Sequence, residues 1–259
     1  MDWVPSWSGG IPPDGALGIS GLLNWQFVLV LTLTAELETL LGESEFANLT
    51  KKRATELAGK VSAAFWDDQE GLFSDDLLYQ HFSEHTQCLA ILSGCLDPIR
   101  KRRVADALIS HPDLARTTVY FTHYLFEAYR EIGHINAIWD RMNLWFNLVK
   151  NGFKTPVEQP EPSRSDCHAW GAHPLFHYFS TILGIRPASL GFRTVRISPQ
   201  LGPLTHAHGR LVHPLGEILV DFRMSGHVLH GEIILPDVVT GKFEYQGNTI
   251  DLHEGKQNI

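Results

Sequence analysis

Residues 19–41 read ISGLLNWQFVLVLTLTAELETLL, and this stretch decides the fold class of the chain. Apolar residues occupy nearly every face of the helix that the pattern predicts, and Gly42 ends it. A helix that is apolar all round is expected to lie deep inside a helical assembly, because no face of it suits water. The apolar run is broken by Asn24, Gln26 and Thr32 and is too short to cross a bilayer. The stretch therefore predicts a large helical domain and no membrane partner.

Helical patterns continue on the C-terminal side of this stretch. A second helix is expected at residues 44–65, where apolar residues recur every few positions. Turn-forming residues separate the helices after it, and the last helix is expected to end before Gly184. The later helices are expected at residues 84–92, 97–109, 118–132, 135–150 and 168–183, and loops are expected at residues 1–16 and 67–79. Consecutive helices with short links predict one layered helical domain over residues 1–186.

The sequence pattern changes at about Pro187. Short β-branched runs follow, and Gly and Pro separate them at the spacing of an all-β structure. The expected strands span residues 194–197, 218–222, 228–235, 242–245 and 249–252. We therefore expect a small β-sandwich over residues 187–259. The fold class that follows is mainly α with a C-terminal all-β module.

Charge and composition exclude several classes of function. The chain has 21 basic and 29 acidic residues and a formal net charge of -8. Its one short basic run, Arg100–Arg103, is expected on a solvated helix face, so no nucleic-acid partner is predicted. The 3 cysteines do not form a disulfide framework. The N-terminal residues lack the basic and apolar segments of a signal peptide, so we expect a cytoplasmic protein.

Candidate chemistry is concentrated in residues 155–176, TPVEQPEPSRSDCHAWGAHPLF. Glu158 lies in a proline-rich loop, just ahead of an expected helix start that carries His168 and Trp170. A carboxylate can activate water, an imidazole can hydrogen-bond hydroxyl groups, and an indole can stack on the apolar face of a sugar ring. Catalytic groups are often found on loops that a rigid scaffold holds. The stretch therefore predicts a carbohydrate site.

Several residues in this stretch allow another interpretation. On its own, Glu158 is more simply a solvated loop carboxylate, and Glu161 competes with it for the same role. Asp166 is expected to cap the helix that follows. His173 and His177 follow His168, but no ligand set of sound spacing completes a metal site. We therefore expect neither a metal nor another cofactor.

Taken in order, these features resemble the C-terminal part of an inverting α-L-rhamnosidase of the six-hairpin glycosidase superfamily. The matching segments are WDRMNLWFNLVKNGFKTPVE (139–158), SRSDCHAWGAHPLF (163–176), ILGIRPASLGFRTVRISPQLG (182–202), SEHTQCLA (83–90) and Asp2-Trp3. The resemblance implies that the helical residues are part of an (α/α)6 barrel and that a small β-sandwich follows it. It also implies a rhamnose-containing glycoside as the carbohydrate partner.

The resemblance implies a role for individual residues. The Thr-Thr-x-Trp-Glu element that carries the family's general base corresponds to Thr155-Pro156-Val157-Glu158, which makes Glu158 the base and puts Val157 where the family has an aromatic residue. His168 occupies the place of a histidine that contacts the sugar, and Trp170 follows on the adjoining turn. Asp2-Trp3 corresponds to a Gly-Asp-Trp element whose Trp lines the sugar subsite, so both residues are expected to bind substrate.

The resemblance also implies what this chain does not contain. The family's general acid is a Glu in an acidic, Arg-containing loop upstream of the Gly-Asp-Trp element, and the expected helices are about half of a closed barrel. We therefore expect a fragment that lacks the general acid, from an enzyme that hydrolyses terminal α-L-rhamnosides with inversion. Two alternatives stay open: a non-catalytic carbohydrate-binding or vestigial protein, and a six-hairpin glycosidase for another sugar.

Overall fold

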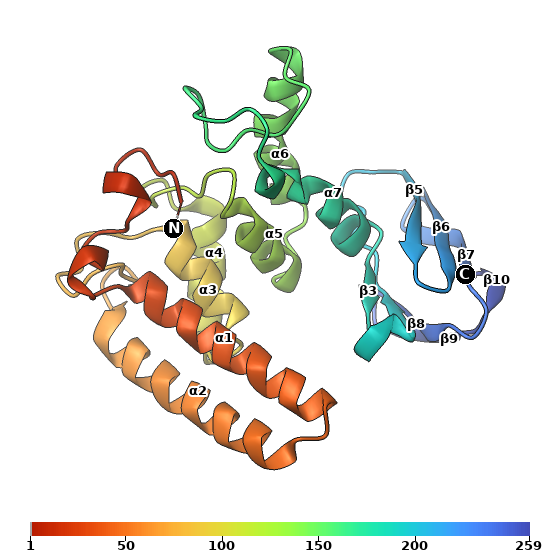
Figure 1. Cartoon of the computed structure of the whole chain (residues 1–259), viewed down its shortest axis with the longest axis horizontal. Helices are drawn as coiled ribbons and strands as arrows, with labels where there is room; N and C mark the ends of the chain where they lie inside the picture. The colour runs from red at the N-terminus through yellow and green to blue at the C-terminus, as the bar shows by residue number, and fades with distance from the viewer. Residues whose placement is uncertain (1) are drawn as a thin grey trace. The chain divides into compact units, whose positions relative to one another are not determined.

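A helical part is followed by a β part in the computed structural model, which describes residues 2–259 (Figure 1). The chain divides into two compact units. One unit comprises the residues up to 137 and residues 143–171, and the other comprises residues 138–142 and 172–259. The expected mainly α chain with a C-terminal β module is confirmed at this level.

The helical unit begins with a hairpin of two long helices, α1 (Gly21–Leu40) and α2 (Ser44–Phe65) (Figure 1). Ser20 caps α1, because its hydroxyl accepts a hydrogen bond from the backbone N–H of Leu23 at 3.2 Å. One face of α1 is buried against α2 and α3. The opposite face is apolar but exposed, so the expectation that this helix is buried all round is wrong. No helix within residues 2–259 is long and apolar enough to span a membrane.

Helix α3 (Glu84–Leu92) is the centre of the helical unit. Residues 84–91 are all buried, and α1, α4 (Pro98–Ser110) and α5 (Thr122–Glu131) pack around them. Its N-terminal cap is Ser83, whose hydroxyl accepts from the N–H of Thr86 at 3.3 Å. A fully buried helix with polar residues in its first turn needs internal partners for them, and these partners form the network described below.

Two expected elements of this unit differ from the structure. The loop expected at residues 67–79 overlaps a small hairpin, in which β1 (Trp66–Asp67) pairs with β2 (Leu72–Phe73) and Phe73 packs in the core against Trp25 at a ring distance of 4.8 Å. The helix expected from residue 118 begins only at Thr122, because the backbone N–H of Thr118 donates to the carboxylate of Asp2. Helix α6 (Asn136–Lys150) follows as expected.

The last expected helix, 168–183, is broken into three pieces. A 3₁₀ turn at Ala169–Ala172 precedes α7 (His173–His177), and a π-helical turn follows at Tyr178–Ile182. Pro174 lies in the first turn of α7, where its missing N–H and fixed φ favour a new helix start. Gly184 ends the segment at a φ of 71°, and a Cβ there would lie 2.2 Å from the backbone of Ser198. Only glycine fits this close approach.

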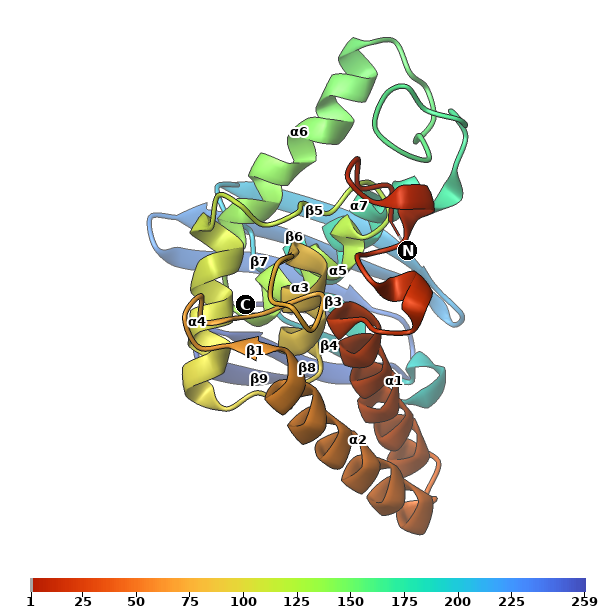
Figure 2. The same ribbon diagram turned by 90° about the vertical axis from the view of Figure 1, so that its left-hand side faces the viewer.

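The β unit consists of two four-stranded sheets, β10-β7-β6-β5 and β3-β4-β8-β9. In Figure 2, β5, β6 and β7 lie in the upper sheet and β4, β8 and β9 in the lower one. The strands are β3 (Ile185–Pro187), β4 (Thr194–Ile197), β5 (His206–His213), β6 (Gly216–Ser225), β7 (Val228–Leu235), β8 (Thr240–Tyr245), β9 (Asn248–Leu252) and β10 (Gly255–Asn258). All pairings are antiparallel except β4 with β8.

Alternating burial along the strands builds the core of the β unit. Ile218, Val220 and Phe222 are buried in turn along β6. The ring of Phe222 lies 6.1 Å from that of Phe243 in β8, so the two sheets share one core. Strands β3, β5 and β10 were not expected, because each is short or carries polar residues and glycine in place of a β-branched run.

Candidate active site

Glu158 lies in the loop between α6 and α7. The loop folds back on itself: the N–H of Glu158 donates to the carbonyl of Ser165, and the N–H of His168 donates to the carbonyl of Pro156, each at 2.9 Å. Val157 is buried, so its side chain anchors the loop in the protein interior. Glu158 itself is only 2% exposed. This carboxylate is therefore not a solvated loop residue.

Arg164 covers the carboxylate of Glu158. Its Nη2 donates to Oε1, and its Nε donates to Oε2 at 3.2 Å, which is a bidentate ion pair. The guanidinium group also stacks on Trp3, with its central carbon 4.5 Å from the ring centre. The side chain of Arg164 is 63% exposed. Arg164 thus forms the solvent-facing half of the pair, and it contacts both the carboxylate and the Trp3 ring.

Hydrogen bonds from Arg164 lower the pKa of Glu158. Burial acts in the opposite direction, but electrostatic interactions with Arg164 and His168 and a hydrogen bond from Trp3 add to the lowering. The same pairing raises the pKa of Arg164. Glu158 is therefore ionised at neutral pH, which is the state that a general base requires.

Aromatic side chains surround Glu158. The indole Nε1 of Trp170 donates to the backbone carbonyl of Glu158 at 3.3 Å. The Trp170 ring lies 4.4 Å from the ring of His168 and 5.4 Å from that of Tyr120. Trp170 is 40% exposed, so part of the indole is open to a ligand. A partly exposed indole ring beside a carboxylate suits the apolar face of a sugar.

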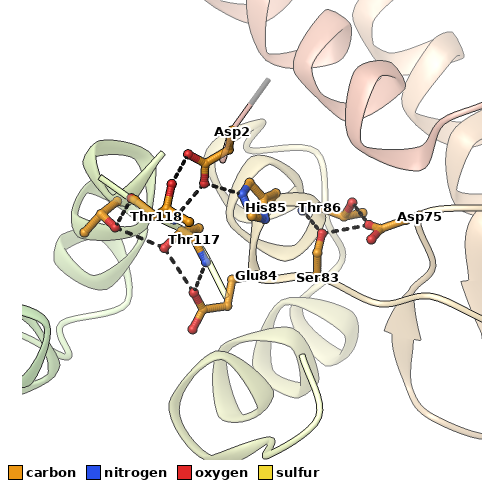
Figure 3. Close-up of polar contacts among 9 residues, drawn as sticks. Asp2, Asp75, Ser83, Glu84, His85, Thr86, Thr117 and Thr118 are labelled. Atoms are coloured by element: carbon orange, nitrogen blue, oxygen red, sulfur yellow. Dashed lines mark hydrogen bonds and ion pairs between the residues drawn. The ribbon is translucent and has the colours of Figure 1, made fainter. Parts of the chain in front are cut away.

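Asp2 is held in a buried polar network (Figure 3). Its carboxylate accepts hydrogen bonds from the N–H and the hydroxyl of Thr118, at 2.7 and 2.5 Å, and lies 2.7 Å from Nε2 of His85. Burial would raise the pKa of Asp2, but the contacts with His85 and Thr118 outweigh it and lower the pKa. The rings of Trp7 and Phe121 pack on His85 at 4.6 and 4.5 Å. The network fixes the backbone beside Trp3.

Two further carboxylates lie in the same polar region (Figure 3). Glu84 accepts from the N–H and hydroxyl of Thr117, at 2.7 and 3.0 Å. Asp75 accepts from the hydroxyls of Ser83 and Thr86, and its Oδ2 has no hydrogen-bond partner among residues 2–259. Burial raises the pKa of Asp75 to about 6, although both hydroxyl groups act to lower it. These contacts give Glu84 and Thr86, in the first turn of α3, buried hydrogen-bond partners.

The structure brings four of the five sequence-predicted site residues to one place. Glu158 is at the centre, with His168, Trp170 and Trp3 near it. The fifth, Asp2, lies behind them in the buried network, and its contact with a sugar stays a prediction. The competing carboxylate, Glu161, is exposed and accepts from the N–H of Ser163 at 3.1 Å.

Two residues of the site were not predicted. Arg164 was within the quoted stretch, but only the folding of the loop shows that its guanidinium pairs with Glu158. Tyr120 precedes α5 and comes to Trp170 through tertiary packing alone. No local sequence pattern would have found Tyr120, whereas an Arg six residues after the candidate base was a usable signal.

Comparisons with known proteins agree on one family. Residues 184–258 match the family model of the bacterial α-L-rhamnosidase C-terminal domain. The α-L-rhamnosidase of Alteromonas sp. (strain LOR) is 23% identical over 241 residues, which cover 84% of this chain and 25% of that protein. The expected resemblance to α-L-rhamnosidases is confirmed by these similarities.

Solved structures of rhamnosidases also resemble this chain in fold. The GH78 family rhamnosidase of Bacillus sp. GL1 superposes with a TM-score of 0.79 and 25% identity, covering 88% of this chain and 26% of that chain. The α-L-rhamnosidase of Streptomyces avermitilis, complexed with L-rhamnose, has the same fold at a TM-score of 0.72 and 17% identity, covering 91% of this chain and 26% of that chain. This chain therefore spans about a quarter of the length of these relatives.

Proposed function

We propose that this chain carries the water-activating side of an α-L-rhamnosidase site, with Glu158 as the general base. The observation that supports this most is the buried, ionised carboxylate of Glu158, surrounded by Trp3, His168 and Trp170. The relatives are α-L-rhamnosidases by name, and one of them was solved with L-rhamnose. The substrate we propose is a terminal α-L-rhamnoside.

The proposed reaction is hydrolysis with inversion. Glu158 takes a proton from a water molecule as its oxygen attacks the anomeric carbon from the face opposite the leaving group. The glycosidic bond breaks, and a general acid on the other side protonates the leaving oxygen. In inverting glycosidases the two carboxyl groups lie about 6.5–9.5 Å apart, which leaves room for the water. We assign the acid to polypeptide outside residues 2–259.

Each neighbour of Glu158 has a proposed role in sugar binding or in keeping the base charged. Trp170 and Trp3 stack on the sugar ring, and His168 hydrogen-bonds its hydroxyl groups. Arg164 keeps Glu158 charged and has to turn aside when water and sugar arrive, because it covers the carboxylate. We further propose that the helical unit corresponds to part of an (α/α)6 barrel and the β unit to the β-sandwich that follows it.

Replacing Glu158 by Gln tests the assignment of the base. The change keeps the shape of the side chain but removes the proton acceptor. We expect release of rhamnose from an aryl α-L-rhamnoside to fall by about 10²–10⁴-fold, which is the usual contribution of one proton-transfer group. Glu161→Gln is the matched control and should keep wild-type activity. Equal activity in wild type and Glu158→Gln would reject Glu158 as the base.

A second candidate function is sugar binding without turnover. The observation that favours it is the ion pair itself, since both oxygens of the buried Glu158 carboxylate accept hydrogen bonds from Arg164. Calorimetric titration with L-rhamnose separates the two functions. Binding without rhamnose release supports a binding protein, whereas release that depends on Glu158 supports the enzyme. Parallel assays with other aryl glycosides would detect a glycosidase for another sugar.

A further inference from the structure

The carboxylate of Asp2 joins three segments of the helical unit that are far apart in the sequence (Figure 3). Its Oδ1 accepts from the hydroxyl of Thr118 at 2.5 Å, and its Oδ2 accepts from the Thr118 N–H and from Nε2 of His85, each at 2.7 Å. Because an ionised carboxylate can only accept, Nε2 of His85 carries the hydrogen of this bond. Asp2 is only 3% exposed. A sugar hydroxyl group therefore has almost no access to this carboxylate, which was expected to bind substrate.

The ring of His85 is fixed by its surroundings. His85 is fully buried, and the rings of Trp7 and Phe121 pack on it at 4.6 and 4.5 Å. Its Nδ1 has no hydrogen-bond partner among residues 2–259, so the bond to Asp2 is the polar contact that orients the ring. Replacing a buried charge and its polar partner by well-packed apolar side chains is often neutral for stability. The pair is therefore better explained by the position that it gives to the next residue, Trp3.

Trp3 connects the buried carboxylate of Asp2 to Glu158. The guanidinium carbon of Arg164 lies 4.5 Å from the centre of the Trp3 ring. The side chain of Trp3 also hydrogen-bonds to the carboxylate of Glu158. A displacement of Trp3 would thus act on the base directly and also through Arg164, which donates to both carboxylate oxygens. Since a single peptide bond joins Asp2 to Trp3, whatever fixes the backbone at Asp2 also limits where Trp3 can lie.

We propose that His85 is a positioning residue for Glu158. It holds the carboxylate of Asp2 and so fixes the backbone that carries Trp3. Trp3 in turn keeps its contacts with Arg164 and with Glu158. The part that Glu158 plays in catalysis rests on the proposed function, but the placement of Trp3 by His85 does not. A substitution in the first turn of α3, outside the loop that carries Glu158, should therefore change the surroundings of this carboxylate.

Two substitutions of His85 test the proposal. His85→Leu fills the place of the ring without a donor, whereas the amide of His85→Gln can still donate to Asp2. The measurement is the indole N–H resonance of Trp3 in proton–nitrogen NMR spectra, assigned with Trp3→Phe. We expect this resonance to move in His85→Leu and to stay near its wild-type position in His85→Gln. Carbon NMR titration should show the pKa of Glu158 raised in His85→Leu only, because the hydrogen bond from Trp3 lowers it.

The matched control is His213→Leu in the β unit. His213 is also buried, with Nε2 donating to the carbonyl of Phe192 at 2.8 Å and Nδ1 accepting from the N–H of Leu215 at 3.1 Å. Its replacement removes hydrogen bonds of a buried histidine, so it should lower the midpoint of urea unfolding. It should leave the Trp3 resonance and the titration of Glu158 unchanged.

A milder substitution acts on the same carboxylate without changing the ring. Thr118→Val removes the hydroxyl donor to Asp2 but keeps the backbone N–H, so it should move the Trp3 resonance even if His85→Leu does not fold. A Trp3 resonance that is unchanged in Thr118→Val and in a folded His85→Leu would overturn the proposal. So would a His85→Gln variant that resembles His85→Leu, or equal shifts in His213→Leu.

Activity measurements separate this proposal from the proposed function. Where the wild type releases rhamnose from an aryl α-L-rhamnoside, kcat/KM should fall by up to about 10²-fold in His85→Leu and be retained in His85→Gln. An effect of this size is expected when a remote change misplaces a reacting group by about 1 Å. A wild type that releases no rhamnose would reject the proposed function but not the positioning role, which the Trp3 resonance decides without turnover.

Discussion

At the scale of single residues, the contact that keeps Glu158 charged also covers it. Arg164 donates to both carboxylate oxygens and stacks on Trp3, so the base, its counter-ion and one aromatic wall form a single unit. Asp2, adjacent to Trp3, ties this unit to His85 and Thr118 in the buried network. A change in Arg164 or Trp3 should therefore be felt at Glu158, whereas a change in Asp2 would also remove a buried partner of His85 and Thr118 and so weaken the fold.

Replacing Arg164 by Gln should raise the pKa of Glu158. The change removes the largest cause of the lowering, and the opposing effect of burial remains. Glu158 would then be protonated at a higher pH, and the acid limb of the pH–activity profile would move upward with it. Carbon NMR titration of the Glu158 carboxyl group measures the pKa directly, even if turnover is weak. Arg164→Lys keeps the charge but loses the bidentate geometry, so it should shift the pKa less. Identical titration curves for all three proteins would contradict the assignment.

Replacing Asp75 by Asn should change how stability depends on pH. The pKa of Asp75 is raised from 3.8 to about 6, so the folded state holds a proton that the unfolded state releases. This contribution to stability is complete below about pH 3.8 and is lost as the pH rises through about 6. The loss is on the order of 3 kcal/mol, and the Asp75→Asn variant would not show it, because an amide cannot ionise.

Urea unfolding of the wild type and Asp75→Asn from about pH 4 to pH 7 measures this difference. The amide side chain keeps an oxygen that can accept from Ser83 and Thr86, so the two proteins should be most alike at low pH. Asp2 acts in the opposite sense: its pKa is lowered, so its contribution is present above 3.8 and is lost as the pH falls through the folded value. A stability difference that stays constant with pH would show that Asp75 is not the titrating group.

The residues that the sequence could identify were those in contiguous motifs. Glu158, His168 and Trp170 share one stretch, and Trp3 belongs to a short matching element. What the sequence could not supply was the folding of the loop that brings Arg164 onto Glu158, or the tertiary packing that brings Tyr120 to Trp170. Nor does a pattern of residue types show that Asp2 is buried and bonded to His85.

At the scale of elements, local signals were reliable where the spacing of apolar residues and the flanking turn residues agree. Residues 44–65, 84–92, 194–197 and 228–235 form elements with the expected bounds. The failures occurred where a tertiary contact or a proline overrides the periodicity. Thr118 lies outside the helix and donates its N–H to Asp2, and Pro174 restarts the helix expected from residue 168. Strands such as β10, with few apolar residues, depend on pairing with a neighbour.

The N-terminal cap of α4 gives a prediction at this scale. Asp97 accepts from the N–H groups of Ile99 and Arg100, each at 3.0 Å, and these donors have no partner within the helix. Asp97→Ala should lower the free energy of unfolding by about 1 kcal/mol, the usual cost of losing a cap. Asp97→Asn, which can still accept both bonds, should retain most of the stability. Urea unfolding compares the three proteins, and an Ala variant as stable as wild type would show that the cap contributes nothing.

At the scale of the whole molecule, the same apolar helix that predicted a helical assembly has one face without cover. The sequence indicates that residues 19–41 need apolar neighbours on all sides, and in the structure α2 and α3 supply them on one side only. The apolar pattern of a sequence predicts which side chains are buried, but it does not identify the polypeptide that buries them. The exposed apolar side of α1, from Leu23 to Leu41, is therefore where the sequence predicts a burial that the contacts among residues 2–259 do not provide.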